Sequence, residues 1–162
     1  MDNSGSHMSR IVFASISTAF VLFWSAASFS AEQFGTADEA KAMLERGVTA
    51  LKANQADALR QFNNKNDKQF HDRDLYIFCF KISDGTFTAY QSDVMLGVDV
   101  RELKMQEDPI GQRAYDAVAT APEGTVVSIE YNFPKAGTKK MVPKQSIEER
   151  VGDQACGVTY FK

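Results

Sequence analysis

The pattern of apolar and polar positions between residues 36 and 63 has the period of an α-helix. Apolar residues recur at i, i+3 and i+4 and form one stripe, made of Ala40, Met43, Leu44, Gly47, Val48 and Leu51. Thr36 and Glu39 have the spacing of a capping box, in which hydroxyl and carboxylate satisfy amides of the first turn. The polar segment KANQAD interrupts the stripe before it resumes through Phe62. The pattern therefore predicts a long N-terminal helix that breaks or bends within KANQAD.

Five later segments have patterns typical of β-strands. Leu75 to Phe80 is apolar at every position, which suits a strand covered on both faces, and a Ser-Asp-Gly turn leads to the alternating TFTAYQ. TVVSIEYNF alternates cleanly, with Val127, Ile129, Tyr131 and Phe133 on the inward face. MVPKQSIEERV and QACGVTYF follow after short turns, and Pro143 marks the first of them as irregular or near an edge at its start.

The order of these elements indicates the fold class. A helix, a hairpin, a second helix near Pro109 and three consecutive strands follow one another. Short connections force antiparallel neighbours, so we expect an α+β fold with one antiparallel sheet and helices packed on it.

The N-terminus has the features of processing segments rather than of folded structure. Residues 1–8 resemble an expression-tag remnant, and Met8 then serves as the initiator of a secretory signal peptide over residues 9–30. Arg10, the apolar run IVFASISTAFVLFW and the small residues before Ala31 are its three parts, with cleavage expected before Ala31. A retained membrane anchor is the alternative. We expect residues 31–162 to be one exported domain in the bacterial periplasm, with no stable membrane insertion after cleavage.

Charge and cysteine content narrow the picture further. The formal net charge of −3 argues against nucleic acid and anionic membrane surfaces, which require a concentrated basic patch. Cys79 and Cys156 are the two cysteines, both in strand-like surroundings. An oxidising compartment favours a disulfide between them, although two separate buried thiols remain the alternative. Such a bridge would place the last strand beside the first, which completes a five-stranded PAS-like sheet.

Several blocks together resemble the single Cache domain, type 2. They are DLYIFCFKISDGTFTAY, LGVDVRELKMQEDPIGQ, EGTVVSIEYNFP, VPKQSIEERVGD and the terminal CGVTYFK, and the likeness covers the chain from about Ala37 onward. The family comprises extracytoplasmic ligand-sensing modules of bacterial chemoreceptors and sensor kinases, and it also occurs as free-standing secreted proteins. The resemblance implies a long N-terminal helix packed on one face of the sheet. It also implies a pocket on the other face for small organic acids such as acetate, propionate or pyruvate.

The resemblance also suggests ligand-binding residues. Lys144 keeps the family's lysine after proline and would meet a carboxylate, although a solvated strand lysine is the alternative. The chain departs from the family where Tyr90 stands near a common histidine, and where tryptophan is common near Ser128 and Phe133. The candidate ligand-binding residues are Lys144, Tyr90, Tyr76, Phe78, Tyr131 and Arg73. Core packing for Tyr131 and a local ion pair for Arg73 are the competing interpretations.

Catalysis has little support in the sequence. Apart from the tag's His7, His71 is the single histidine and has no partner at catalytic spacing, and metal-ligand spacings are absent. We therefore expect no enzyme activity, no cofactor and no metal. The function predicted is a periplasmic sensor-type domain that binds a short-chain organic acid, with a membrane sensor or chemoreceptor left open as protein partner. An envelope interaction module that kept the scaffold but lost the pocket, and a hydrolase with an unfamiliar site, are the alternatives.

Overall fold

The computed structural model describes residues 33–135, 137–138 and 140–162, which belong to one compact unit. The predicted tag remnant, the signal peptide and its cleavage point lie outside the described residues. Within the described part of the chain, no helix is long and apolar enough to cross a membrane.

The predicted N-terminal helix and its break are confirmed. Helix α1 (Ala37–Ala53) begins with the capping box, in which the Glu39 amide donates to the Thr36 hydroxyl over 3.2 Å. Asn54 follows the last residue of α1 in an extended conformation, and its side chain caps α2 (Gln55–Phe62). All six residues of the apolar stripe are buried. Gly47 belongs to this stripe because a Cβ there would overlap the Ile77 side chain, so glycine lets α1 approach the sheet closely.

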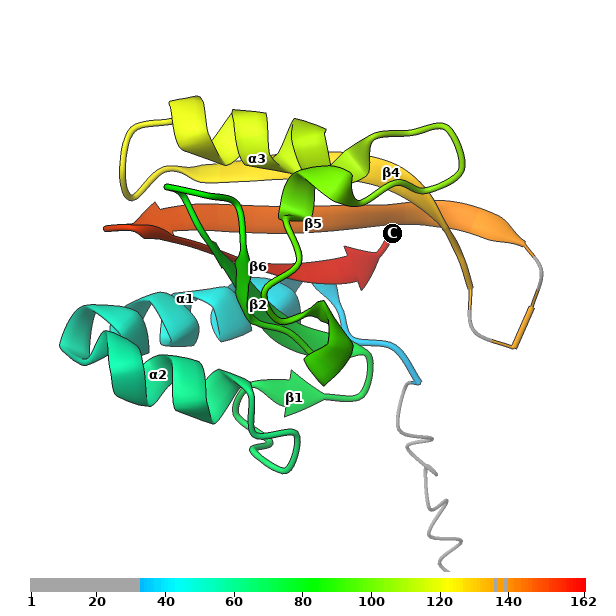
Figure 1. The fold of residues 1–162 in the computed structure, drawn as a ribbon. Helices are drawn as coiled ribbons and strands as arrows, with labels where there is room; N and C mark the ends of the chain where they lie inside the picture. Colours follow the sequence, from blue (N-terminus) through cyan, green and yellow to red (C-terminus); the bar gives the residue numbers. More distant parts are fainter. Residues whose placement is uncertain (1–32, 136, 139) are drawn as a thin grey trace, which may run out of the picture. The chain divides into compact units, whose positions relative to one another are not determined.

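One antiparallel sheet forms the centre of the domain, which confirms the predicted α+β class (Figure 1). Its strands are β1 (His71–Asp72), β2 (Leu75–Lys81), β3 (Phe87–Ala89), β4 (Val126–Pro134), β5 (Met141–Val151) and β6 (Gln154–Phe161). The order is β1-β2-β6-β5-β4, with β3 also paired to β2. The five predicted strands are present, and the two-residue β1 adds a sixth that a polar turn sequence does not reveal. At Pro143 strand β5 is paired with β4, whereas its β6 ladder begins only at Lys144.

The disulfide between Cys79 and Cys156 is present and joins β2 to β6. The two residues are directly opposite each other in the ladder, and both side chains are fully buried. The prediction that the last strand lies beside the first is therefore confirmed, and the link spans 77 residues of chain.

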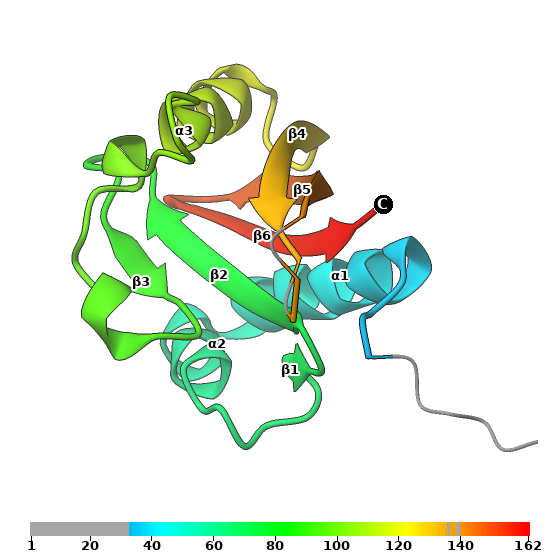
Figure 2. The ribbon, with the colours of Figure 1, turned by 90° about the vertical axis from the view of Figure 1, so that its right-hand side faces the viewer.

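Helices cover both faces of the sheet, as Figure 2 shows. Helices α1 and α2 lie on one face, where Leu75, Ile77, Cys79 and Val158 join their core. The opposite face carries α3 (Ile110–Thr120) and the short turns η1 (Asp93–Met95) and η2 (Val100–Glu102). Phe78 and Phe80 join Val118 of α3 in a second core there. Because side chains alternate along β2, one strand supplies both cores.

Candidate functional site

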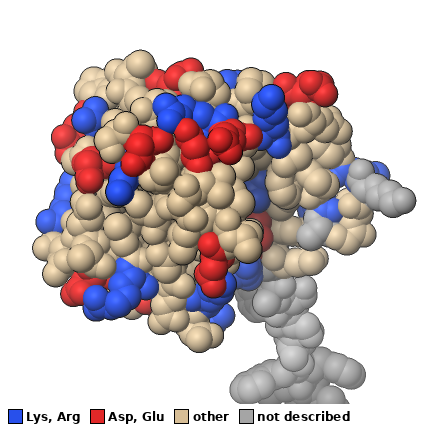
Figure 3. Space-filling view, viewed as in Figure 1, with Lys and Arg blue, Asp and Glu red and all other residues tan. Residues whose placement is uncertain are grey.

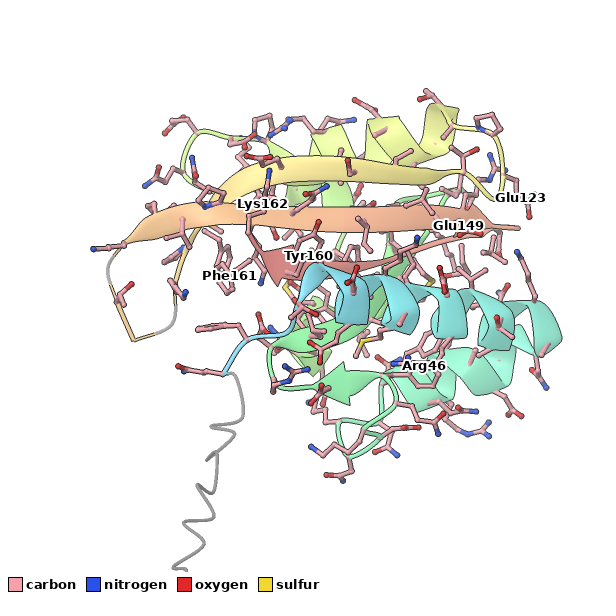
Figure 4. All side chains as sticks on the ribbon, turned by 180° about the vertical axis from the view of Figure 1, so that it is seen from behind. Arg46, Glu123, Glu149, Tyr160, Phe161 and Lys162 are labelled. Atoms are coloured by element: carbon pink, nitrogen blue, oxygen red, sulfur yellow. A yellow bond between two sulfur atoms is a disulfide. The ribbon has the colours of Figure 1, made fainter. Side chains whose placement is uncertain are left out.

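A cavity of about 310 Å³ lies on the face of the sheet opposite α1. Figure 4 views the sheet from the α1 side, where Glu149 and Tyr160 are labelled, so the cavity lies on the face turned away. Residues from the strands form one wall, and the segment from η2 into α3 forms another. The lining residues are Phe34, Asp74, Tyr76, Phe78, Phe87, Tyr90, Gln91, Val100, Leu103, Lys104, Met105, Ile110, Gly111, Ala114, Ile129, Tyr131, Phe133, Pro134, Lys144, Ser146, Glu148, Thr159 and Phe161.

Close packing of α3 against the preceding turn shapes the second wall. Gly111, in the first turn of α3, donates its amide to the Leu103 carbonyl over 3.0 Å. A Cβ on Gly111 would overlap the Val100 carbonyl oxygen, so only glycine lets the helix lie this close to η2. Leu103, which makes this contact, and Ala114, which lies further along α3, both line the cavity.

Aromatic rings line much of the cavity and form two rows. In the β2–β3 aromatic row (Tyr76, Phe78, Phe87, Tyr90), neighbouring ring centroids are 5.0 to 6.4 Å apart. In the β4–β6 aromatic row (Phe34, Tyr131, Phe133, Phe161), they are 5.1 to 6.4 Å apart. Most of these contacts are edge-to-face, the geometry that aromatic pairs prefer. Because each ring packs against its neighbour, the two rows form ordered apolar walls of the cavity.

Lys144 brings a positive charge into this apolar space. It lies on β5 between Tyr131 on β4 and Phe161 on β6, and only 7% of the residue is exposed. Its ammonium nitrogen is 4.9 Å from the ring centroid of Phe133 and 4.7 Å from that of Phe161. Among the described residues no carboxylate oxygen lies within 4.0 Å of this nitrogen. The faces of these two rings are therefore the groups that stabilise the buried ammonium charge, in a cation–π arrangement.

Burial lowers the pKa of the Lys144 ammonium, and the charge of Asp74 partly offsets this effect. Desolvation disfavours the charged form of a lysine, whereas a nearby anion favours it. An anion bound beside the ammonium would therefore raise the pKa of Lys144 again. A carboxylate at this position would thus stabilise the charged form of the lysine.

Ser146 and Glu148 follow Lys144 on the same face of β5 and complete a polar row along the cavity. The Ser146 hydroxyl donates to Glu148 Oε1 over 2.8 Å, and only 1% of Glu148 is exposed. Its Oε2 is buried without a hydrogen-bond partner among the described residues. Gly157 on β6 makes room for this side chain, because a Cβ there would lie 2.6 Å from both Glu148 Cγ and Phe78 Cζ.

Burial raises the pKa of Glu148 from 4.5 to about 7, although the Ser146 hydrogen bond opposes the shift. Between these two values the folded state keeps a proton that the unfolded state has lost. Raising the pH from 4.5 to 7 is therefore expected to reduce the free energy of unfolding by about 3 kcal/mol through this residue. Urea unfolding at closely spaced pH values measures the slope.

Glu148→Gln provides the matched control for this pH dependence, because it keeps the shape of the side chain and removes its titration. The variant should lack the loss between pH 4.5 and 7. The carboxylates with lowered pKa, such as Glu39 at about 2, act in the acid range and in the opposite direction. An identical slope in Glu148→Gln and the unchanged protein would contradict this assignment.

Tyrosine hydroxyls add hydrogen-bond donors to the apolar walls. Burial raises the pKa of Tyr76 and of Tyr131 well above the ordinary value of 10.0, with nearby Tyr90 contributing in the same direction. Both phenols therefore stay protonated at neutral pH and can donate to an acceptor in the cavity.

The residues just before α1 close one side of the cavity. The Gly35 amide donates to Asp74 Oδ1 over 2.7 Å, which ties this segment to the start of β2. Phe34 packs edge-on against Phe161, and the Lys135 ammonium lies 4.7 Å from the Phe34 ring centroid. Asp74 Oδ2 is buried without a hydrogen-bond partner among the described residues.

The structure brings five of the six sequence-predicted residues to the cavity: Tyr76, Phe78, Tyr90, Tyr131 and Lys144. Arg73 does not line it. Its guanidinium contacts Asp72 over 2.7 Å and Glu39 over 2.6 Å, and it donates to the Phe34 carbonyl over 3.2 Å. Arg73 thus makes the local ion pair that was its competing interpretation.

Sequence reasoning missed several residues of the site, above all Ser146, Glu148, Phe34 and Asp74. The period of two along a strand was the available signal for the first two. Once Lys144 faces the pocket, the residues two and four positions later face it as well. Phe34 and Asp74 reach the cavity through tertiary contacts, for which the sequence has no comparable signal.

His71 is held locally. Its Nε2 lies 2.6 Å from the Phe62 carbonyl oxygen, and its ring stacks beside Tyr76.

Within the described ranges, no group of three or more His, Cys, Asp or Glu residues is arranged to hold a metal ion. On the face that Figure 3 shows, lysines and arginines are interspersed with aspartates and glutamates.

The antiparallel sheet, with α1 on one face and the cavity on the other, has the architecture of a PAS-like α+β fold. Solved structures that match this fold include a methyl-accepting chemotaxis protein, a Cache chemosensory domain and the periplasmic sensor domain of a chemotaxis protein. A methyl-accepting chemotaxis protein from Vibrio parahaemolyticus matches with a TM-score of 0.58 and 20% identity, over 76% of this chain and 86% of that one. The chain thus has the fold of a Cache-type sensor domain.

Two further structures support the same assignment of the fold. A Cache chemosensory domain, described for its recognition of carboxylic acids, matches with a TM-score of 0.56 and 13% identity, over 76% of this chain and 91% of that one. The periplasmic sensor domain of a chemotaxis protein matches with a TM-score of 0.52 and 14% identity, over 76% and 88%. No protein-family model matches the sequence, and no curated protein matches it.

Proposed function

We propose that this chain is a periplasmic sensor-type domain that binds a small organic acid in the cavity on the sheet, without transforming it. The observation that carries the proposal is the Lys144 ammonium, buried against two ring faces, with no carboxylate of the described residues in contact. A carboxylate placed there would gain a charge-assisted hydrogen bond in a site of low polarity. Tyr76, Tyr90 and Tyr131 would orient it through their hydroxyls.

The surrounding proposals follow from this one. The bound acid would be the signal that the domain detects. The domain would belong to the type 2 subclass of Cache domains and act as a free-standing secreted protein. A membrane sensor or chemoreceptor would bind the loaded domain as its partner. The recognition of carboxylic acids by a protein with the same fold supports the class of ligand. The alternative, an interaction module without a pocket, is disfavoured because the cavity of about 310 Å³ is larger than acetate or propionate requires.

A binding screen tests the proposal. The purified protein is titrated by calorimetry with sodium salts of organic acids, and sodium chloride at equal ionic strength is the control. We expect saturable binding of at least one acid. The free energy of unfolding should rise by about 2.7 kcal/mol when the concentration of the free acid is one hundred times its dissociation constant. Failure of every acid, aliphatic and aromatic, to bind would overturn the proposed function.

A further inference from the structure

The size and lining of the cavity point to a narrower class of ligand, and this step rests on the proposed function. We infer that the cavity takes an aromatic carboxylate, whose carboxylate meets Lys144 and whose ring packs against the two aromatic rows. The short acids expected from the sequence would then be poor ligands.

The volume of the cavity fits a ligand larger than propionate. An engineered protein cavity of about 150 Å³ takes up benzene, so a cavity of about 310 Å³ has room for a ring of that size together with a short acidic side chain. Phenylacetate, with about ten non-hydrogen atoms, fits this description, whereas propionate has about half as many. A short acid would leave much of the cavity to water or empty, and the unfilled walls would lose their dispersion contacts.

The walls of the cavity are rich in aromatic side chains. Eight of the lining residues are aromatic, Phe34, Tyr76, Phe78, Phe87, Tyr90, Tyr131, Phe133 and Phe161, although aromatic residues make up only 11% of the chain. They come from β2, β3 and its end, β4, β6 and the segment before α1, so the rows extend over separate walls. A flat ring gains from edge-to-face or offset contacts with such rows beyond the burial of its area.

The buried positive charge lies at one end of the polar row along β5. Lys144 Nζ lies against Phe133 and Phe161, at the end of the polar row that Ser146 and Glu148 continue. Val100, Leu103, Ile110 and Ala114 on the opposite wall are apolar. Lys144 is the buried lysine of the described lining, whereas Lys104 on the opposite wall is exposed. One buried cation beside aromatic and aliphatic walls matches a ligand with one carboxylate on an apolar body, and it disfavours a polyanion.

The test compares four probes by calorimetry on the purified protein: propionate, phenylacetate, cyclohexylacetate and 2-phenylethanol. We expect phenylacetate to bind at least about tenfold more tightly than propionate, because burying the ring adds apolar area. It should exceed cyclohexylacetate by roughly threefold, the contribution of aromatic contacts. 2-Phenylethanol, which lacks the carboxylate, should bind at least about thirtyfold more weakly.

The outcomes separate this inference from the proposed function. Propionate binding as tightly as phenylacetate would overturn the inference and leave acid binding intact. Cyclohexylacetate binding more tightly than phenylacetate would overturn the role of the aromatic rows. Binding of 2-phenylethanol as tight as that of phenylacetate, or no binding of any acid, would overturn both.

A pair of variants on α3 locates the ring. Ala114 lines the cavity, whereas Ala117 on the same helix does not. Ala114→Leu should weaken phenylacetate at least about tenfold and change propionate less than about threefold, because it fills part of the space. Ala117→Leu is the matched control and should change neither affinity. Equal affinity of Ala114→Leu and the unchanged protein for phenylacetate would contradict this placement.

Discussion

Replacing Cys79 and Cys156 together by alanine is expected to lower the free energy of unfolding by about 4 kcal/mol. The bridge closes a loop of 77 residues, and in the chain-entropy model most of its effect comes from restricting the unfolded chain. Both cysteines are fully buried between β2 and β6, the two strands that carry Phe78 and Thr159 to the cavity. For a domain of this size the melting temperature should fall by roughly 15 °C.

Two measurements separate the bridge from the packing of its side chains. Reduction of the unchanged protein leaves both sulfur atoms in place and should cause most of the same loss of stability. The single variants Cys79→Ala and Cys156→Ala also break the bridge, so each should approach the double variant. A loss of less than about 1 kcal/mol in the double variant would show that the link contributes little.

Replacing Lys144 by methionine is expected to weaken the binding of any carboxylate at least about thirtyfold. The ammonium is the buried cation of the cavity wall, and a buried charge pair loses 2 to 5 kcal/mol or more, as an order of magnitude, when one partner is truncated. Methionine keeps the length and the apolar stem of the side chain. Calorimetric titration with propionate and phenylacetate measures the effect.

The stability of Lys144→Met distinguishes a lost contact from a lost fold. Burial already lowers the pKa of Lys144, so folding carries a desolvation penalty that methionine removes. The variant should therefore be at least as stable as the unchanged protein at neutral pH, while it binds acids poorly. Lys140→Met, at an exposed position of the turn before β5, is the control for overall charge and should bind normally. Wild-type affinity in Lys144→Met would contradict the assigned role.

Periodicity explains which parts of the fold were predictable. The stripe from Ala40 to Leu51 and the alternation from Val127 to Phe133 depend on local geometry, which the sequence states directly. The disulfide pairing was predictable because only one pairing of two cysteines exists. Strand β1 was missed because His71 and Asp72, which pair with β2, are polar and too few to show an alternating pattern.

The candidate site was predictable only in part, because its residues meet through tertiary contacts. Tyr76 and Phe78 followed from their parity on β2, and Lys144 from the family resemblance. Arg73 was also a candidate in the sequence, with a local ion pair as the competing interpretation, and Glu39 at the start of α1 and Asp72 engage its guanidinium. To predict that Glu148 lies in the cavity, one would need to know both which face of β5 is turned toward it and that Gly157 leaves space for the side chain. The volume of the cavity depends on side chains from many elements at once, which no local pattern encodes.

A crystal structure of the protein grown with propionate or phenylacetate would show directly where an organic acid binds. We expect density for the acid on the sheet face opposite α1, with a carboxylate oxygen about 3 Å from Lys144 Nζ. An acid bound elsewhere, or a cavity closed by the protein's own side chains at saturating concentrations of both acids, would contradict this expectation.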